Sequence, residues 1–174
     1  MTLTERVLGD ERRQRLAFAA IIAFGILCRL VQYAWRRSFW HDESYLVLNI
    51  VNGHFSSVFQ RLSHEQAAPP AFLWVQMGIV GLLGTSEYAL RLFPLIVGCA
   101  NVVLMAVLAR RVASPSAAII ATALFALSDA SIWHVVESKQ YTSDVFVALL
   151  LWLCATTRWN DEQSTSLDRR RLLL

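Results

Sequence analysis

Long apolar runs are the feature that most constrains how this chain folds. Three of them, residues 16–35, 88–109 and 117–136, are each about as long as a bilayer crossing requires, and a further one begins at residues 145–157. A helix of 20 residues covers about 30 Å, which is the thickness of the hydrocarbon core of a membrane. Hydrophobic residues make up 56% of the chain and charged residues 17%, against about 45–50% and about 25% in soluble domains. The chain is therefore predicted to be an integral membrane protein.

Two other segments are apolar but unsuited to crossing. The run at residues 71–83 follows Pro69-Pro70 and is 13 residues long, and runs of about 10–14 residues are more often interfacial than spanning. Residues 43–62 carry apolar side chains at mostly helical spacing among polar ones. Such an amphipathic helix lies along the membrane surface. Both segments are predicted to be helices at one face of the membrane.

Basic residues flank the apolar runs and predict the orientation. Arginines close to the ends of spans stay on the cytoplasmic side. If residues 71–83 do not cross, four crossings put three basic clusters in the cytoplasm and both acidic clusters outside. The cytoplasmic clusters are Arg6, Arg12, Arg13 and Arg15, then Arg110 and Arg111, then Arg169, Arg170 and Arg171, and the outer exception is Arg36 with Arg37.

The predicted fold class is all-α integral membrane, with about four transmembrane helices and two outer-face juxtamembrane helices. Residues 1–15 are interpreted as a cytoplasmic N-terminus, residues 16–157 as the membrane module with an outer loop at 36–87, and residues 158–174 as a cytoplasmic tail. The basic clusters do not form a stripe interleaved with aromatic residues, so nucleic-acid binding is not expected. The three cysteines, Cys28, Cys99 and Cys154, lie in apolar runs, which favours small buried residues over disulfides or a zinc site.

The first outer loop carries an adjacent acidic pair, Asp42 and Glu43. Carboxylates placed just beyond a span suit a general base or a metal ligand. The alternative is structural, because Asp42 is also well placed to be the N-cap of the following helix. The two roles are compatible, since a capped loop also fixes the position of a carboxylate.

A second polar group follows the run at residues 117–136. If that segment is helical, a spacing of i, i+3, i+7 and i+10 places on one face His134, Glu137, Tyr141 and Asp144. Ionisable groups near a membrane usually face a cavity or each other, and the alternative is an ordinary solvated helix end. Lys139 points away from this face and would join it only if the helix breaks nearby.

Three other polar positions have a simpler interpretation and a functional one. Arg29 lies in the first span, where it would extend to the membrane surface or contact a lipid phosphate or an outer acid. His64 and Glu65 precede the Pro-Pro pair and are either site residues or part of a Pro-bounded loop, which we favour. Glu87 and Arg91 have the i, i+4 spacing of a local ion pair.

Several of these strings, taken in order, resemble one class of membrane enzyme. The strings are Phe39-Trp40-His41-Asp42-Glu43, His64-Glu65-Gln66-Ala67-Ala68-Pro69-Pro70-Ala71-Phe72, Thr85-Ser86-Glu87-Tyr88-Ala89-Leu90-Arg91-Leu92-Phe93-Pro94 and Glu137-Ser138-Lys139-Gln140-Tyr141. Over about residues 16–157 the chain resembles the N-terminal portion of GT-C glycosyltransferases, of the protein O-mannosyltransferase-like branch (family 39). Several ordered motifs carry this resemblance, and no single one would suffice.

The resemblance implies transfer of a sugar from a polyprenyl-phosphate donor to an acceptor at the outer membrane face. Asp42 would be the catalytic base or metal contact, and Glu43 would support it. Lys139 and Arg29 would lie near the donor phosphate. Substrate contacts would also come from His64, Glu65, Glu137, Tyr141 and Asp144. No cofactor is certain, but Asp42 and Glu137 would suit a divalent cation such as Mg²⁺ or Mn²⁺.

The chain departs from that class in length, because its members are several times longer than the resembling region. The leading interpretation is therefore an N-terminal module whose partners are a polyprenyl-phosphate-linked sugar donor, membrane lipid and a second membrane chain that supplies further helices. The alternative is a non-enzymatic membrane assembly subunit or a truncated remnant of such an enzyme. A small transporter is disfavoured, because the sequence has no internal repeat.

Overall fold

The computed structural model of the chain describes residues 3–35 and 37–171, with side chains from residue 10 to residue 157 apart from residue 36. Helices account for all the regular structure in these ranges. The α-helices are α1 (Leu3–Ala34), α2 (His41–Asn52), α3 (Pro70–Leu83), α4 (Glu87–Val112), α5 (Pro115–Ala126), α6 (Asp129–Trp133) and α7 (Tyr141–Arg171). Three short 3₁₀ turns are η1 (Ser57–Phe59), η2 (Ser63–Glu65) and η3 (His134–Val136). Arg36 and the side chains of Arg6, Arg169, Arg170 and Arg171 lie outside the described part.

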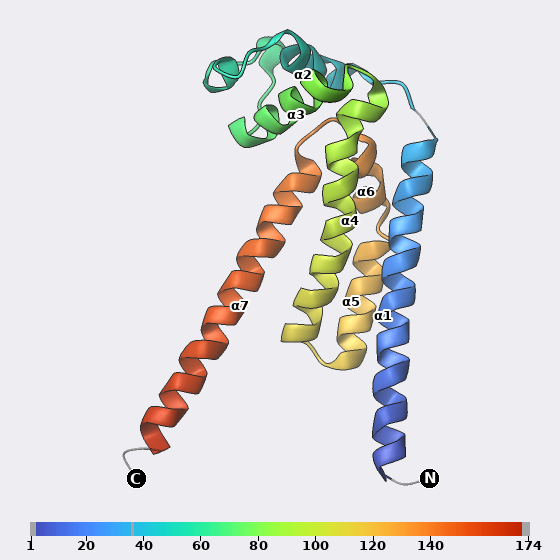
Figure 1. The fold of residues 1–174 in the computed structure, drawn as a ribbon, viewed down its shortest axis with the longest axis vertical. Coiled ribbons are helices and arrows are strands. Elements are labelled where there is room, and N and C mark those ends of the chain that lie inside the picture. The colour runs from blue at the N-terminus through green and yellow to red at the C-terminus, as the bar shows by residue number, and fades with distance from the viewer. Residues whose placement is uncertain (1–2, 36, 172–174) are drawn as a thin grey trace.

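The long helices run side by side, and the two short apolar helices lie across one end of them. In Figure 1, α1, α4 and α5 follow the long axis of the molecule and α7 runs obliquely away from them, whereas α2 and α3 lie across the top. Both termini and the α4–α5 turn lie at the opposite end. Leu46 and Ile50 of α2 pack with Leu73 of α3 and Leu90 of α4 in one buried cluster, which fastens the cross-lying helices to the bundle.

The membrane character predicted from the sequence is confirmed, and the number of crossings is confirmed only in part. Asp10–Ala34 and Glu87–Val112 are each long and apolar enough to span a bilayer. The run at residues 117–136 is not one straight helix: α5 and the segment Asp129–Val136 are bent by 52° and count as a third span only together. The shorter apolar helices are Pro70–Leu83 and Tyr141–Thr157. A fourth crossing at α7 stays a prediction.

A buried arginine holds the bend between α5 and α6. Arg29 of α1 is fully buried, and its guanidinium donates to the carbonyl oxygens of Gly25 at 2.8 Å and Ala126 at 2.9 Å, and to the Ser131 hydroxyl. Ala126 ends α5, where the last carbonyls of a helix have no partner within it. The structure therefore corrects the prediction for Arg29: it fastens the bend and does not extend to the surface or to the polar cluster described below.

A proline inside α4 creates the attachment point for α3. Pro94 has no N–H, so the carbonyl oxygen of Leu90, four residues earlier, has no donor within the helix. The side-chain amide of Gln76, fully buried on α3, donates to this oxygen at 2.9 Å. The hydrogen bond that the proline removes from α4 is thus replaced by a bond between the two helices.

The amphipathic segment at residues 43–62 is helical over less of its length than predicted. Helix α2 stops at Asn52, and the chain continues through Gly53 and η1. A Cβ on Gly53 would lie 2.4 Å from the Asn49 carbonyl oxygen and 2.6 Å from Cε of Met77. Only glycine fits between α2 and α3 here, so the helix ends where the chain must pass close to α3.

Another glycine lets η3 approach α4. A Cβ on Gly98 would lie 2.2 Å from Cγ1 of Val135, a fully buried side chain on η3. Val135 is β-branched and held on all sides, so it has little freedom to move away. The close contact sets the position of η3, and with it the loop of residues 137–140 that follows.

We expect Gly98→Ala to lower the free energy of unfolding by about 1–3 kcal/mol, because it overpacks this contact. Thermal unfolding of the purified chain in detergent measures the change. Gly78→Ala on α3 is the matched control, since its Cβ would meet nothing within 4 Å, and replacing a helical glycine there should be neutral or slightly stabilising. Equal stability of the two variants would contradict the packing argument.

Candidate functional site

The acidic pair at the start of α2 is divided between the interior and the surface. Helix α2 begins at His41, and Trp40 occupies the N-cap position without a side-chain cap. The prediction that Asp42 caps the helix is therefore wrong: Asp42 and Glu43 both lie in the first turn. Consecutive helical residues point about 100° apart, so Glu43 is 1% exposed while the Asp42 side chain is 47% exposed. The two carboxylates can therefore have different roles.

Glu43 joins three parts of the fold. Its two oxygens accept hydrogen bonds from Nε of Arg91 at 3.1 Å and from Nη2 at 2.8 Å. Oε1 also accepts from the backbone N–H of Ser138 at 2.8 Å, and Arg91 donates in addition to the carbonyl of Arg37. With both oxygens occupied and no exposure, Glu43 holds α2, α4 and the 137–140 loop together. Its structural role is positioning rather than proton transfer.

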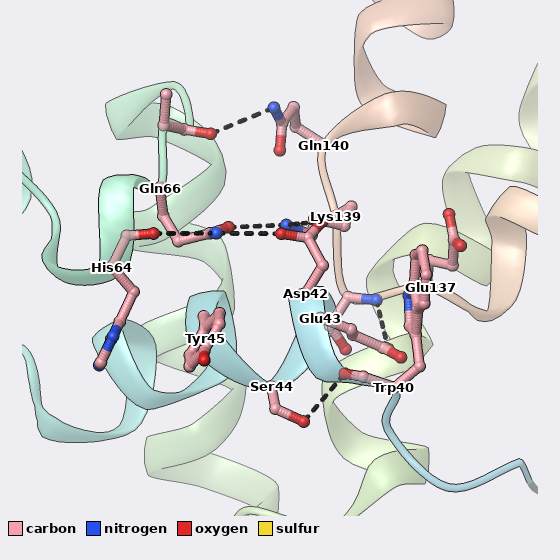
Figure 2. Close-up of polar contacts among 12 residues, drawn as sticks. Trp40, Asp42, Glu43, Ser44, Tyr45, His64, Gln66, Glu137, Lys139 and Gln140 are labelled. Carbon is pink, nitrogen blue, oxygen red and sulfur yellow. Dashed lines mark hydrogen bonds and ion pairs between the residues drawn. The ribbon is translucent and has the colours of Figure 1, made fainter.

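Asp42 lies in a triangle with Lys139 and Gln66, which Figure 2 shows converging from three elements. Nζ of Lys139 is 2.8 Å from Oδ2 of Asp42. The Gln66 amide donates to Oδ1 of Asp42 at 3.0 Å and accepts from Lys139 at 2.7 Å. These bonds, that from Lys139 first, lower the pKa of Asp42 below its ordinary value. The carboxylate is ionised, half-exposed and fixed in direction.

Gln66 reaches this position through a strained turn. His64 and Glu65 both have positive φ angles, 58° and 56°, in a region that costs non-glycine residues about 1–3 kcal/mol each. The His64 ring stacks on Tyr45 with centroids 4.4 Å apart and planes 12° apart. The Glu65 side chain is exposed. The structure thus brings His64 beside the cluster through Tyr45, and places Gln66, which the sequence did not single out, inside it.

The second polar group does not lie on one continuous helix as predicted. Helix α6 ends at Trp133, η3 follows, and α7 begins only at Tyr141, so residues 137–140 form a loop. This break turns Lys139 inward, where its side chain is 7% exposed and meets Asp42. The sequence analysis expected Lys139 to join the acidic residues only if the helix breaks nearby, and the helix does break there.

The members of that group are only partly separated, because His134 stays in contact with both Glu137 and Tyr141. Glu137 is buried and accepts hydrogen bonds from the Trp133 indole at 2.9 Å, with Nδ1 of His134 at 2.6 Å from its other oxygen. The Tyr141 ring packs on His134 with centroids 4.7 Å apart. Asp144 is exposed. Glu137 therefore anchors the start of the loop, whereas Lys139 is the residue of the loop that forms an ion pair with Asp42.

The predicted metal pair does not form a metal site in this arrangement. The oxygens of Asp42 are engaged by Lys139 and Gln66, and those of Glu137 by Trp133 and His134. The described residues contain no group of three or more His, Cys, Asp or Glu placed to hold an ion.

Comparison with known proteins gives the family. The sequence model of the dolichyl-phosphate-mannose-protein mannosyltransferases matches residues 67–164, which is more than half of the chain. The chain belongs to this family. It is a mannosyltransferase-like glycosyltransferase module in a membrane protein, as the sequence resemblance indicated. No curated protein and no solved structure gives a significant match.

The segment that matches the family includes Lys139 and Arg91, but not the acidic residues with which they pair. Arg91 and the 137–140 loop lie inside the matched segment, whereas Asp42 and Gln66 precede it. The contacts of Asp42 with Lys139 and of Glu43 with Arg91 connect the first outer loop to the matched segment. Sequence spacing had suggested Glu87 as the partner of Arg91, and only the fold shows that Glu43 accepts from Nε and Nη2 of its guanidinium.

We expect Arg91→Met to lower the free energy of unfolding by about 3–5 kcal/mol, because it leaves Glu43 charged, buried and unpaired. Glu43→Gln in the same chain should recover part of that loss, so the double-mutant cycle is non-additive. Denaturant or thermal unfolding in detergent measures it. Arg15→Gln is the control: its pair with Glu11 is long, 3.6 Å, and exposed, so its loss should change stability by less than about 1 kcal/mol. Additive effects of the two buried substitutions would contradict the assignment.

Proposed function

We propose that Asp42, Lys139 and Gln66 form the acceptor-activating part of a glycosyl-transfer site that uses a polyprenyl-phosphate-linked sugar as donor. One observation carries this proposal: a half-exposed carboxylate is held against a buried lysine by an amide that bonds to both, in a member of a membrane mannosyltransferase family. The arrangement offers a base and a cation within one hydrogen-bond length of each other.

The proposed roles follow from the charges. Asp42 accepts the proton of an acceptor hydroxyl, whose oxygen forms a bond to C1 of the donor sugar. The bond between C1 and the phosphate oxygen breaks, and its electron pair leaves with the polyprenyl phosphate. Lys139 balances the negative charge that develops on this leaving group. Gln66 keeps the carboxylate and the ammonium in register, and Glu43, through the Ser138 N–H, fixes the loop that carries Lys139.

Lys139 serves two anions in this scheme. Without donor it pairs with Asp42, and this pairing keeps the pKa of Asp42 low. A donor phosphate that arrives beside the cluster competes for the same ammonium. When Lys139 turns toward the phosphate, the pKa of Asp42 rises and the carboxylate becomes a stronger base. Binding of the donor would therefore prepare the base before the acceptor reacts.

The proposed orientation puts this cluster on the outer side of the membrane. Arg110 and Arg111 lie in the last turn of α4, at the same end of the molecule as both termini and opposite α2 and α3 (Figure 1). The positive-inside rule assigns that basic end to the cytoplasm. Arg37, the exception at the other end, packs its guanidinium over the Trp133 ring at 3.8 Å, which gives it a local structural reason to be there. A second membrane chain that contributes further helices to the donor side fits the same proposal.

Asp42→Asn should reduce sugar transfer by about 10²–10⁴-fold, the usual contribution of a general base, while the chain is still expressed and folded. Transfer from a radiolabelled polyprenyl-phosphate sugar, in membranes that hold the full chain and its co-encoded membrane partners, measures the effect. Glu11→Gln is the matched acid-to-amide control and should retain activity, because Glu11 lies in the N-terminal part of α1, far from α2. Undiminished transfer by the Asp42 variant would remove Asp42 from catalysis and favour the assembly-subunit interpretation.

Lys139→Gln should move the acid limb of the pH profile of kcat/KM to higher pH. The pairing lowers the pKa of Asp42, and a base is lost as pH falls through its pKa, so removing Lys139 makes the loss begin earlier on acidification. Gln66→Leu removes the weaker of the two hydrogen bonds that lower the pKa of Asp42. It should therefore shift the acid limb of the profile in the same direction, but by less.

If the Lys139 variant is too slow to assay, the pH dependence of the free energy of unfolding tests the same pairing. The wild-type protein loses the contribution of the pair only as pH falls through the lowered pKa, and the variant should lack this acid-dependent loss.

A further inference from the structure

An apolar pocket lies inside the bundle at the bend between α5 and α6, and the chemistry proposed above makes no use of it. It holds about 220 Å³, and the surface that it presents is almost entirely apolar. It extends from His134 and Tyr141 to Asn101 in the middle of α4, between walls that include Gly98, Phe125, Ala130 and Val145. Helix α4 and the bent pair of α5 with α6 have the hydropathy of membrane spans, so the pocket lies within the part of the fold that belongs in the membrane.

The size of the pocket limits what it can hold. Pockets that take drug-sized ligands usually hold about 300–1,000 Å³, so this one has room for part of a single hydrocarbon chain. At the end away from His134, the Asn101 amide donates to the carbonyl oxygen of Thr142 at 2.8 Å and joins α4 to α7. The pocket is partly open, and the rest of a longer chain can therefore lie in the surrounding membrane.

His134, at the other end of the pocket, is held by a buried acid. The Glu137 side chain is 7% exposed, and its Oε2 lies 2.6 Å from Nδ1 of His134. Among the described residues no lysine or arginine pairs with Glu137, and a buried carboxylate favours a positive charge on the group that it contacts. With Nδ1 directed at Glu137, Nε2 makes no hydrogen bond to another described residue. In a charged ring this nitrogen is a donor for an anion.

Other groups around His134 suit an anion as well. The Tyr141 ring packs on His134 with centroids 4.7 Å apart, and its hydroxyl is a further donor. The Arg37 guanidinium lies over the Trp133 ring at 3.8 Å. Lys139 belongs to the same loop as Glu137, beside Asp42 in Figure 2. Cationic groups at one end of an apolar pocket match an amphiphile with an anionic head.

We infer that this pocket is a binding site for an isoprenoid phosphate, with the phosphate at His134 and Tyr141 and the first part of the chain between α4 and α7. That this lipid is the sugar donor rests on the proposed function, whereas its binding does not. A phospholipid matches less well, because it has two chains and the pocket has room for part of one. His134 would give the donor phosphate a second cation besides Lys139.

Equilibrium binding tests the inference without requiring transfer. The purified full chain, with any co-purifying partner, is titrated in mixed micelles with farnesyl phosphate, with farnesol or with phosphatidic acid. The wild-type chain should bind farnesyl phosphate about tenfold more tightly than either of the others. His134→Gln should weaken the binding of farnesyl phosphate about tenfold, which corresponds to about 1.4 kcal/mol, and leave that of farnesol unchanged. Ala130→Phe places a ring at the pocket wall and should weaken the binding of both isoprenoids.

Matched controls use the same substitutions at exposed positions away from the pocket. His54→Gln, between α2 and η1, and Ala117→Phe, near the start of α5, should bind as the wild type does. Thermal unfolding shows whether each variant is folded. If His134→Gln is not, Tyr141→Phe, which removes only a hydroxyl from an exposed ring, should still weaken the binding of farnesyl phosphate a few-fold.

Three results would overturn the inference: no binding of farnesyl phosphate, equal affinity for phosphatidic acid, or binding that the pocket variants do not weaken. Asp42→Asn should bind farnesyl phosphate as the wild type does. A wild-type chain that binds this lipid but transfers no sugar would reject the proposed reaction and keep the lipid site. A chain that transfers sugar while His134→Gln and Ala130→Phe bind the lipid normally would reject the site and keep the reaction.

Discussion

The arrangement of the polar end depends on the ion pair between Glu43 and Arg91. Both oxygens of the carboxylate are bonded, one of them also by the Ser138 N–H, and neither partner is more than 5% exposed. A buried pair of this kind gains little net stability over an apolar substitute, yet breaking it is costly. The ion pair therefore fixes how the elements that carry it are placed relative to one another. It requires α2, α4 and the loop before α7 to meet in one way, and the position of Lys139 follows from it.

Two contacts deeper in the bundle, one polar and one apolar, make that meeting possible. Arg29 holds the end of α5 and the start of α6 together, which fixes the bend. Gly98 then allows Val135 on η3 to touch α4 directly. The chain emerges from this contact as a loop, with Glu137 bonded back to Trp133 and His134. The loop that carries Lys139 thus begins from a packed base.

Much of this could be predicted from the sequence, and the failures share one cause. The apolar runs predicted helices and a membrane, and the ordered motifs predicted the family and named Asp42 and Lys139. The helix through residues 134–144, the N-cap at Asp42 and the surface role of Arg29 were wrong, and Gln66 was not found. Each failure assumed that a residue interacts with its neighbours in the chain. The decisive partners, Gln66 with Lys139 and Glu43 with Arg91, are 73 and 48 residues apart.

The sequence by itself determined that the chain is helical, that it belongs in a membrane, and which acidic and basic residues lie near the ends of its helices. Composition and periodicity suffice for this, because hydrophobic burial and helix formation depend on residues close together in the chain. Only the tertiary structure decided that Glu43 faces inward while Asp42 faces out, that a helix break brings Lys139 to Asp42, and that an apolar pocket lies beside His134. These features depend on which distant segments pack together, and on the cost of leaving a buried charge without a partner.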